Sequence, residues 1–190
     1  MTEIDRAYSN DIVAEKVVTT ADGDWNALAR QIHQDNVAKG FWPGGISARN
    51  VGELLALVHS ELSEAYEAIQ SMAFDDKLPE FPAFDVEIAD AMIRLLDAGA
   101  AYEVDMNEVV ENVPFNPYEG VAHHIAVAHL LVSNALEAHR KGRTEDFKSA
   151  VSETFHYLVN TCFHYNSDFE VIDAKLAYNR SRPFMHGKKY

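Results

Sequence analysis

The segment 51-VGELLALVHSELSEAYEAIQ-70 determines the expected fold, because its apolar residues recur every three or four positions. On an ideal helix, Leu54, Val58, Leu62 and Ala65 share one face about 100° wide. The same spacing dominates the rest of the chain, and strict alternation over the length of a strand is nearly absent. The sequence therefore predicts an all-α fold, a helical bundle of long helices joined by short turns.

Capping residues, glycines and prolines divide the chain into expected helices. These helices cover residues 25–39, 48–71, 83–103, 119–140, 144–166 and 168–180, and a short helix is expected to begin at Asp105. Asp22 or Asp24 can cap the first helix, and Pro82 suits the first turn of the third. We expect one domain over 1–190, with a catalytic helical hairpin in 20–107, a candidate degenerate repeat in 119–167, and a phosphate-binding helix and tail in 168–190.

An internal similarity underlies the candidate repeat. Residues 59–68, HSELSEAYEA, agree with residues 129–138, HLLVSNALEA, at five of ten positions. In this alignment Glu61 corresponds to Leu131, and Glu64 corresponds to Asn134. Two interpretations stay open: a duplicated hairpin whose second copy has kept its packing and lost its acids, or a chance match between helices of similar composition.

The composition excludes several classes of protein. Lys and Arg number 16 against 30 Asp and Glu, and the resulting net charge of −14 disfavours a broad nucleic-acid footprint. The sequence lacks the run of about 18 apolar residues that a membrane helix needs, and residues 1–16 carry acids where a signal peptide carries Lys or Arg. The single cysteine, Cys162, cannot form an intramolecular disulfide. We therefore expect a cytoplasmic protein that binds neither nucleic acid nor membranes.

Two pairs of acids spaced i, i+3 occur on consecutive predicted helices. Glu61 lies on the margin of the apolar face of residues 51–70 and Glu64 on its shoulder, and Glu87 and Asp90 follow on the next helix. All four carboxylates can converge at one level if these helices pack antiparallel. Such a cluster repels itself without cations, and its oxygen atoms suit a hard ion such as Mg²⁺. A solvated row of surface charges is the alternative.

The C-terminal residues 175–190, KLAYNRSRPFMHGKKY, contain five Lys and Arg and no acid. Lys175 and Asn179 are spaced i, i+4 and can offer a cation and an amide donor to one anion. An acidic metal site together with a basic anion-binding segment is the combination expected for a polyphosphate substrate. A basic tail without a partner is the alternative.

These residues resemble the MazG-like, all-α nucleoside triphosphate pyrophosphohydrolases, whose motif is Glu-Glu-x-x-Glu, a spacer and then Glu-x-x-Asp on two antiparallel helices. Here the motif reads Ser60-Glu61-Leu62-Ser63-Glu64 and Glu87-Ile88-Ala89-Asp90, with 22 residues between the two parts. The strings GFWPGG, VGELLALVHSELSEAYEA and KLAYNRSRPFMHGKK are also similar to the family, and the resemblance covers about 25–107 and 170–189. Ser60 replaces the first Glu of the motif, which puts the number of bound metal ions in doubt.

The resemblance implies hydrolysis of (d)NTPs between the α and β phosphates to (d)NMP and pyrophosphate, with Mg²⁺ as cofactor and Mn²⁺ as its substitute. It implies that Glu61 and Glu64 are catalytic, with Glu64 orienting the attacking water or accepting its proton. The metal ligands that it implies are Glu61, Glu64, Glu87 and Asp90. Family members assemble as dimers or tetramers, so we expect a homodimer or a homotetramer.

Substrate contacts are expected from two further groups of residues. The expected phosphate-binding residues are Lys175, Asn179 and Arg182. The expected base- or sugar-binding residues are His33, Asn36 and Trp42. Trp42 suits a place in the core or in an interface equally well.

Two other functions stay open on the sequence. Glu153 and His156 form a Glu-x-x-His pair, as in di-iron carboxylate bundles, but that site needs two such pairs and two further Glu. A non-catalytic helical assembly module is the other alternative. The intact acids in the first half of the chain argue against an assembly module.

Overall fold

The computed structural model describes residues 19–109 and 114–187, so that residues 1–18, 110–113 and 188–190, which include Lys188 and Lys189 of the basic tail, lie outside it. The described residues contain no β-strand, which confirms the all-α prediction. The helices are α1 (Trp25–Ala38), α2 (Val51–Ser71), α3 (Ala83–Ala101), α4 (Val121–Arg140), α5 (Thr144–Tyr165) and α6 (Glu170–Ser181). None of these helices is both long and apolar enough to cross a membrane.

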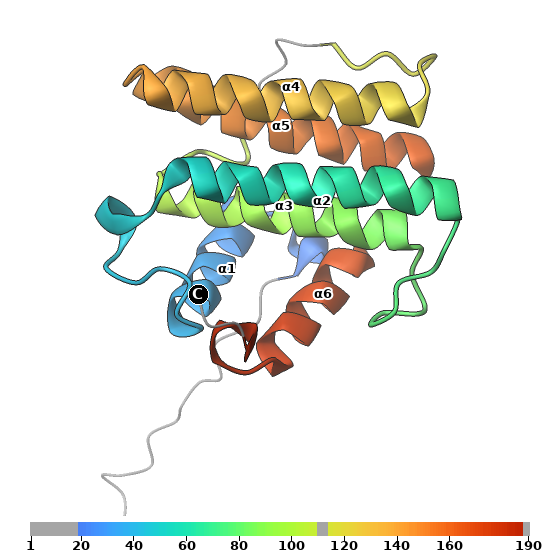
Figure 1. Ribbon diagram of the computed structural model, residues 1–190, viewed down its shortest axis with the longest axis horizontal. Coiled ribbons are helices and arrows are strands. Elements are labelled where there is room, and N and C mark those ends of the chain that lie inside the picture. The colour runs from blue at the N-terminus through green and yellow to red at the C-terminus, as the bar shows by residue number, and fades with distance from the viewer. Residues whose placement is uncertain (1–18, 110–113, 188–190) are drawn as a thin grey trace, which may run out of the picture.

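The helices form three layers, with α4 and α5 on one side, α2 and α3 in the middle, and α1 and α6 on the other side (Figure 1). Helix α3 is central, because it contacts α1, α2, α5 and α6. Its sequence is correspondingly apolar around most of its circumference, as is typical of a helix covered by neighbours. The polar residues of α3 therefore lie either at its edges or against specific partners.

Helices α2 and α3 form the antiparallel hairpin that the acid spacing required (Figure 1). The side chain of Asn50 caps the start of α2 by accepting from the amide of Glu53 at 3.2 Å. The connection is closed by two backbone hydrogen bonds, one from Ala83 N to Ala73 O at 2.9 Å and one from Asp75 N to Phe81 O at 3.1 Å. This connection sets the register in which the acids of α2 face those of α3.

Most helix ends agree with the predictions, and two details differ. Asp24 caps α1 through the amide of Ala27, whereas Pro82 precedes α3 as its N-cap instead of lying in its first turn. The short helix expected from Asp105 is wrong for the described residues 105–109. Asp105 Oδ1 accepts instead from Asn26 Nδ2 at 2.6 Å and from Asn107 N at 3.0 Å. These side-chain hydrogen bonds compete with helix formation.

The burial pattern of α2 recurs in α4. Every residue from 54 to 66 in α2 has the same degree of burial, whether buried, partly buried or exposed, as the residue 70 positions later in α4. His59 and His129, which the alignment pairs, stack with ring centroids 5.0 Å apart, and their Nδ1 atoms are 2.7 Å apart. Helices α2 and α4 therefore pack through equivalent positions, and Leu131 occupies the buried position that Glu61 occupies in α2.

Candidate functional site

Three of the four predicted acids meet between α2 and α3. Glu61, Glu87 and Asp90 each offer a carboxylate oxygen within 4.8 Å of the other two. Glu61 is only 7% exposed, and Glu87 and Asp90 are partly buried. Within the described ranges this is the only group of three or more His, Cys, Asp or Glu residues that could hold a metal ion. Its oxygen-only donor set fits a hard divalent cation.

Electrostatics within this acid cluster favour a bound cation. Burial, reinforced by the charges of Asp90 and Glu61, raises the pKa of Glu87 to about 8. Burial also raises the pKa of Asp90 to about 6, although the nearby Lys175 opposes the shift. The three carboxyl groups are therefore not all ionised near neutral pH, and a bound divalent ion would favour their ionised forms.

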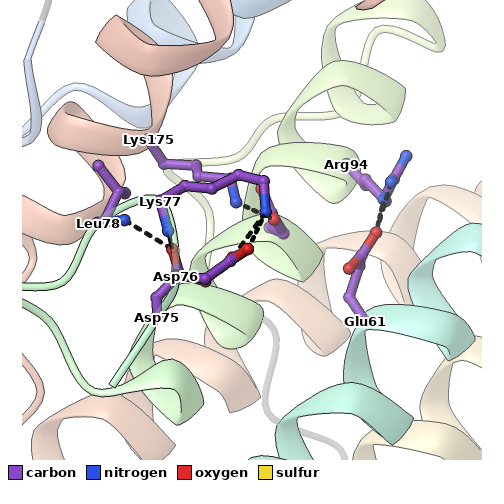
Figure 2. A network of polar contacts seen from close by, with 8 residues as sticks. Glu61, Asp75, Asp76, Lys77, Leu78, Arg94 and Lys175 are labelled. Carbon is purple, nitrogen blue, oxygen red and sulfur yellow. Dashed lines mark hydrogen bonds and ion pairs between the residues drawn. The ribbon is translucent and has the colours of Figure 1, made fainter. Parts of the chain in front are cut away.

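Two basic side chains neutralise part of the acid cluster. Arg94 donates to Glu61 Oε1 through both Nε, at 2.7 Å, and a terminal guanidinium nitrogen. Lys175 Nζ lies 2.7 Å from Asp90 Oδ2. Figure 2 shows Glu61 and Arg94 pointing toward each other, and Lys175 beside the α2–α3 connection. The ion pair of Arg94 with Glu61 was not predicted, because the i, i+4 spacing of Arg94 from Asp90 indicates a pair within α3 and not one with α2.

Glu64 does not join the three converging acids. Its side chain is exposed, and its Oε1 accepts from Ser60 Oγ at 2.9 Å. Three residues turn an ideal helix by about 300°, so Glu64 projects about 60° away from Glu61 around α2. Its charge is still close enough to contribute to the raised pKa of Glu87. Glu64 therefore borders the acid cluster from the solvent side.

The predicted base- or sugar-binding residues converge on a buried carboxylate that the sequence did not single out. Asp97, 8% exposed, accepts from Asn36 Nδ2 at 2.8 Å and from Trp42 Nε1 at 3.1 Å, and His33 Nδ1 lies 2.7 Å from its Oδ1. Trp42 is 6% exposed, so its ring belongs to the core. Asp97 therefore joins α1 and the following loop to α3.

A cavity of about 250 Å³ brings together residues from both predicted substrate-binding groups. Its lining includes Asn36 from α1, Asn179 from α6 and Ile93, which follows Asp90 by three residues on α3. Lys39, also in the lining, donates to the carbonyl oxygens of Arg180, at 2.8 Å, and Arg182. The cavity therefore lies where α1, α3 and the C-terminal segment meet.

Arg182 does not line this cavity. Its guanidinium carbon lies over the ring of Tyr178, 5.6 Å from the ring centroid. Lys175, the remaining predicted phosphate ligand, is buried and paired with Asp90. Lys175 Nζ also lies 6.0 Å from the centroid of the Tyr178 ring, so Lys175 and Arg182 approach the same ring, whereas Asn179 lines the cavity.

The Glu-x-x-His pair on α5 acquires no metal-binding partners among the described residues. Neither Glu153 nor His156 belongs to a group of three or more candidate ligands. His156 Nε2 lies 3.1 Å from the carbonyl oxygen of Met106, and both Glu153 and His156 are buried. These contacts support a packing role for the pair.

Comparisons of this chain with protein-family models, with curated proteins and with solved structures found no significant match.

Proposed function

We propose that the protein is a Mg²⁺-dependent nucleoside triphosphate pyrophosphohydrolase that converts (d)NTPs to (d)NMP and pyrophosphate. The observation that carries this proposal is the convergence of Glu61, Glu87 and Asp90 within 4.8 Å of one another. The resemblance of the two acid motifs to the MazG-like family supplies the reaction class. The cavity that contains Asn36 and Asn179 supports it, since a nucleotide needs room for its base and sugar next to its phosphates.

The three converging carboxylates would hold the ion, and Glu64 would complete the set from the solvent side. A bound Mg²⁺ would neutralise phosphate charge and lower the pKa of water, and Mn²⁺ could replace it. Glu64 would orient a water molecule or accept its proton, which its exposure and the lack of a basic partner among the described ion pairs support.

The predicted phosphate-binding side chains of the C-terminal segment would bind the phosphates. Lys175 has three N–H donors, so it can keep its contact with Asp90 and still donate to a phosphate oxygen. Asn179 would donate from the cavity, and Arg182 would join after leaving Tyr178. These donors would stabilise the charge that moves onto the departing pyrophosphate.

The test is pyrophosphate release from each of the eight common ribo- and deoxyribonucleoside triphosphates, with Mg²⁺ and with EDTA. We expect release with at least one nucleotide, its loss in EDTA, and a decrease of at least about a hundredfold in Glu87→Gln. Glu67→Gln is the matched control, because Glu67 is an exposed acid of α2 outside the cluster. Inactivity with every nucleotide, or full activity in Glu87→Gln, would refute the proposal.

The family resemblance also supports a homodimer or homotetramer, and the lone Cys162 supports a reducing, cytoplasmic setting. Light scattering after size exclusion would measure the oligomeric state. A monomer at micromolar concentration would contradict the proposed assembly without affecting the proposed reaction.

A further inference from the structure

A second cavity, of about 410 Å³, lies at a different place in the fold from the acid cluster. It opens where the α2–α3 connection meets the start of α4 and the end of α5, and its lining contains none of the predicted site residues. Ile69 and Met72 come from the end of α2, Phe74 and Phe84 from the α2–α3 connection and the start of α3, and Tyr165 ends α5.

The walls of this cavity are mostly apolar and include three aromatic rings, those of Phe74, Phe84 and Tyr165. Phe84 and Tyr165 meet edge to face, with ring centroids 6.1 Å apart and planes at 86°. Phe74 is 65% exposed, although large apolar side chains are normally covered. The two backbone hydrogen bonds that close the α2–α3 connection flank Phe74 and hold this side of the cavity in place.

One carboxylate, Asp85, faces these aromatic walls without a cationic partner. Asp85 lines the cavity, is partly buried and accepts from Ser167 Oγ at 2.6 Å, but forms no ion pair with any described residue. Burial raises its pKa, and the charge of Asp168 raises it further. The hydroxyl of Tyr165 is also buried and has no hydrogen-bond partner within the described ranges. A carboxylate without an ion-pair partner and a hydroxyl without a hydrogen-bond partner therefore lie together at an apolar site of the described structure.

We propose that this cavity binds a small organic ammonium ion, with its charged nitrogen beside Asp85 and the aromatic faces and its apolar part against Ile69 and Met72. Aromatic rings attract cations through their negative faces, and a carboxylate adds a full charge. A neutral apolar ligand would leave Asp85 unpaired, and an anion would be repelled by Asp85 and Asp168. The net charge of −14 also favours the approach of cations.

The experiment titrates the whole protein with 2-phenylethylammonium and, separately, with 2-phenylethanol, which has similar size but no charge. Both titrations are followed by protein NMR at pH 8 and constant ionic strength, because His124 lies beside Tyr165 and burial lowers its pKa, so that its ring is neutral there. We expect the ammonium ion to bind about tenfold more tightly than the alcohol. The affected signals should include those of Phe74 and Tyr165.

Two variants distinguish binding in the cavity from a general attraction of cations by the negative charge of the protein. Asp85→Asn should remove the preference for the ammonium ion while keeping an acceptor for Ser167. Asp76→Asn should keep the preference, because Asp76 lies in the same connection but outside the cavity lining. Equal binding of the two probes, no binding of either, or equal effects of the two variants would overturn the proposal. None of these results depends on the proposed hydrolase activity.

Discussion

Arg94 of α3 donates to Glu61 of α2, so a guanidinium occupies the junction of the two helices that carry the candidate metal ligands. The side chain of Glu61 is 9% exposed and that of Arg94 is 33% exposed, so water screens the pair only in part. Arg94 thus neutralises one member of the acid cluster when no metal ion is bound. It also competes with any metal ion for Glu61.

Arg94→Gln should lower the free energy of unfolding of the metal-free protein by about 1–3 kcal/mol, because Glu61 stays buried without its cation. The same change should strengthen Mn²⁺ binding about tenfold, because the competing guanidinium is gone. Denaturant unfolding in EDTA and Mn²⁺ titration followed by electron paramagnetic resonance measure the two effects. Arg140→Gln, which removes an exposed pair within α4, is the control. Unchanged Mn²⁺ affinity in Arg94→Gln would show that Arg94 does not compete for Glu61.

Glu87 predicts an unusual dependence of stability on pH. Its pKa rises to about 8 in the folded protein from 4.5, so the folded state holds a proton that the unfolded state releases. The contribution of Glu87 to the free energy of unfolding is therefore fully present below about pH 4.5 and is lost as the pH rises through 8. Between pH 5.5 and 8.5, the metal-free protein should lose on the order of 2 kcal/mol, which urea unfolding in EDTA measures. Glu87→Gln should flatten this profile. Saturating Mg²⁺ should flatten it as well, because a bound cation favours the ionised form.

Asp97 should contribute strongly to stability, because three side chains bond to its carboxylate. Asp97→Ala leaves the buried N–H of Trp42 and the amide of Asn36 without their acceptor, and should cost about 2–4 kcal/mol. Tryptophan fluorescence during denaturant unfolding reports both the stability and the altered surroundings of Trp42. Asp97→Asn, which keeps one acceptor oxygen, should cost less. Equal stability of Asp97→Ala and the parent protein would contradict the role of Asp97 in joining α1 to α3.

Gly40 should control the position of the C-terminal segment. A Cβ at Gly40 would lie 2.1 Å from the ring of Phe184, and its φ of +86° also strains any side chain. Gly40→Ala should therefore displace Phe184 and break the bond from Met185 N to Lys39 O, which is 2.8 Å long. Hydrogen exchange of the Met185 amide should accelerate at least about tenfold.

Gly23→Ala is the matched control for the Gly40 prediction. Gly23 has a φ of +68°, but nothing lies within 4 Å of its Cβ position. Both substitutions therefore introduce backbone strain, and only Gly40→Ala introduces a clash. Equal acceleration of Met185 exchange in the two variants would show that strain alone releases the C-terminal segment.

The sequence predicted what depends on local regularity. The 3.6-residue period located the six helices, and counting residues along an antiparallel hairpin predicted that the acids of α2 meet Glu87 and Asp90, which Glu61 does. Glu64 stays outside the three because it projects about 60° away from Glu61 around α2. The count of residues measured only the position along the helix axis. The helix expected from Asp105 failed because Asn26, 79 positions earlier, binds its carboxylate.

Contacts between residues that lie far apart in the chain could not be predicted from local patterns. Asp97 lies 61 residues from Asn36 and 55 from Trp42, and no period in the sequence connects them. The pairing of Lys175 with Asp90 likewise depends on how α6 packs against α3. The sequence therefore predicted which residue types matter, whereas the packing of helices decides which of them touch.

The correspondence between α2 and α4 has an evolutionary consequence. Identical subunits of a symmetric assembly share one gene, so a mutation that removes an acid removes it from every copy at once. Two hairpins joined in one polypeptide inherit changes separately. If the second hairpin is a copy of the first, Leu131 and Asn134 could thus replace its acids while Glu61 and Glu64 were retained, and the equal burial of residues 54–66 and 124–136 means that such a change would leave the packing positions as they were.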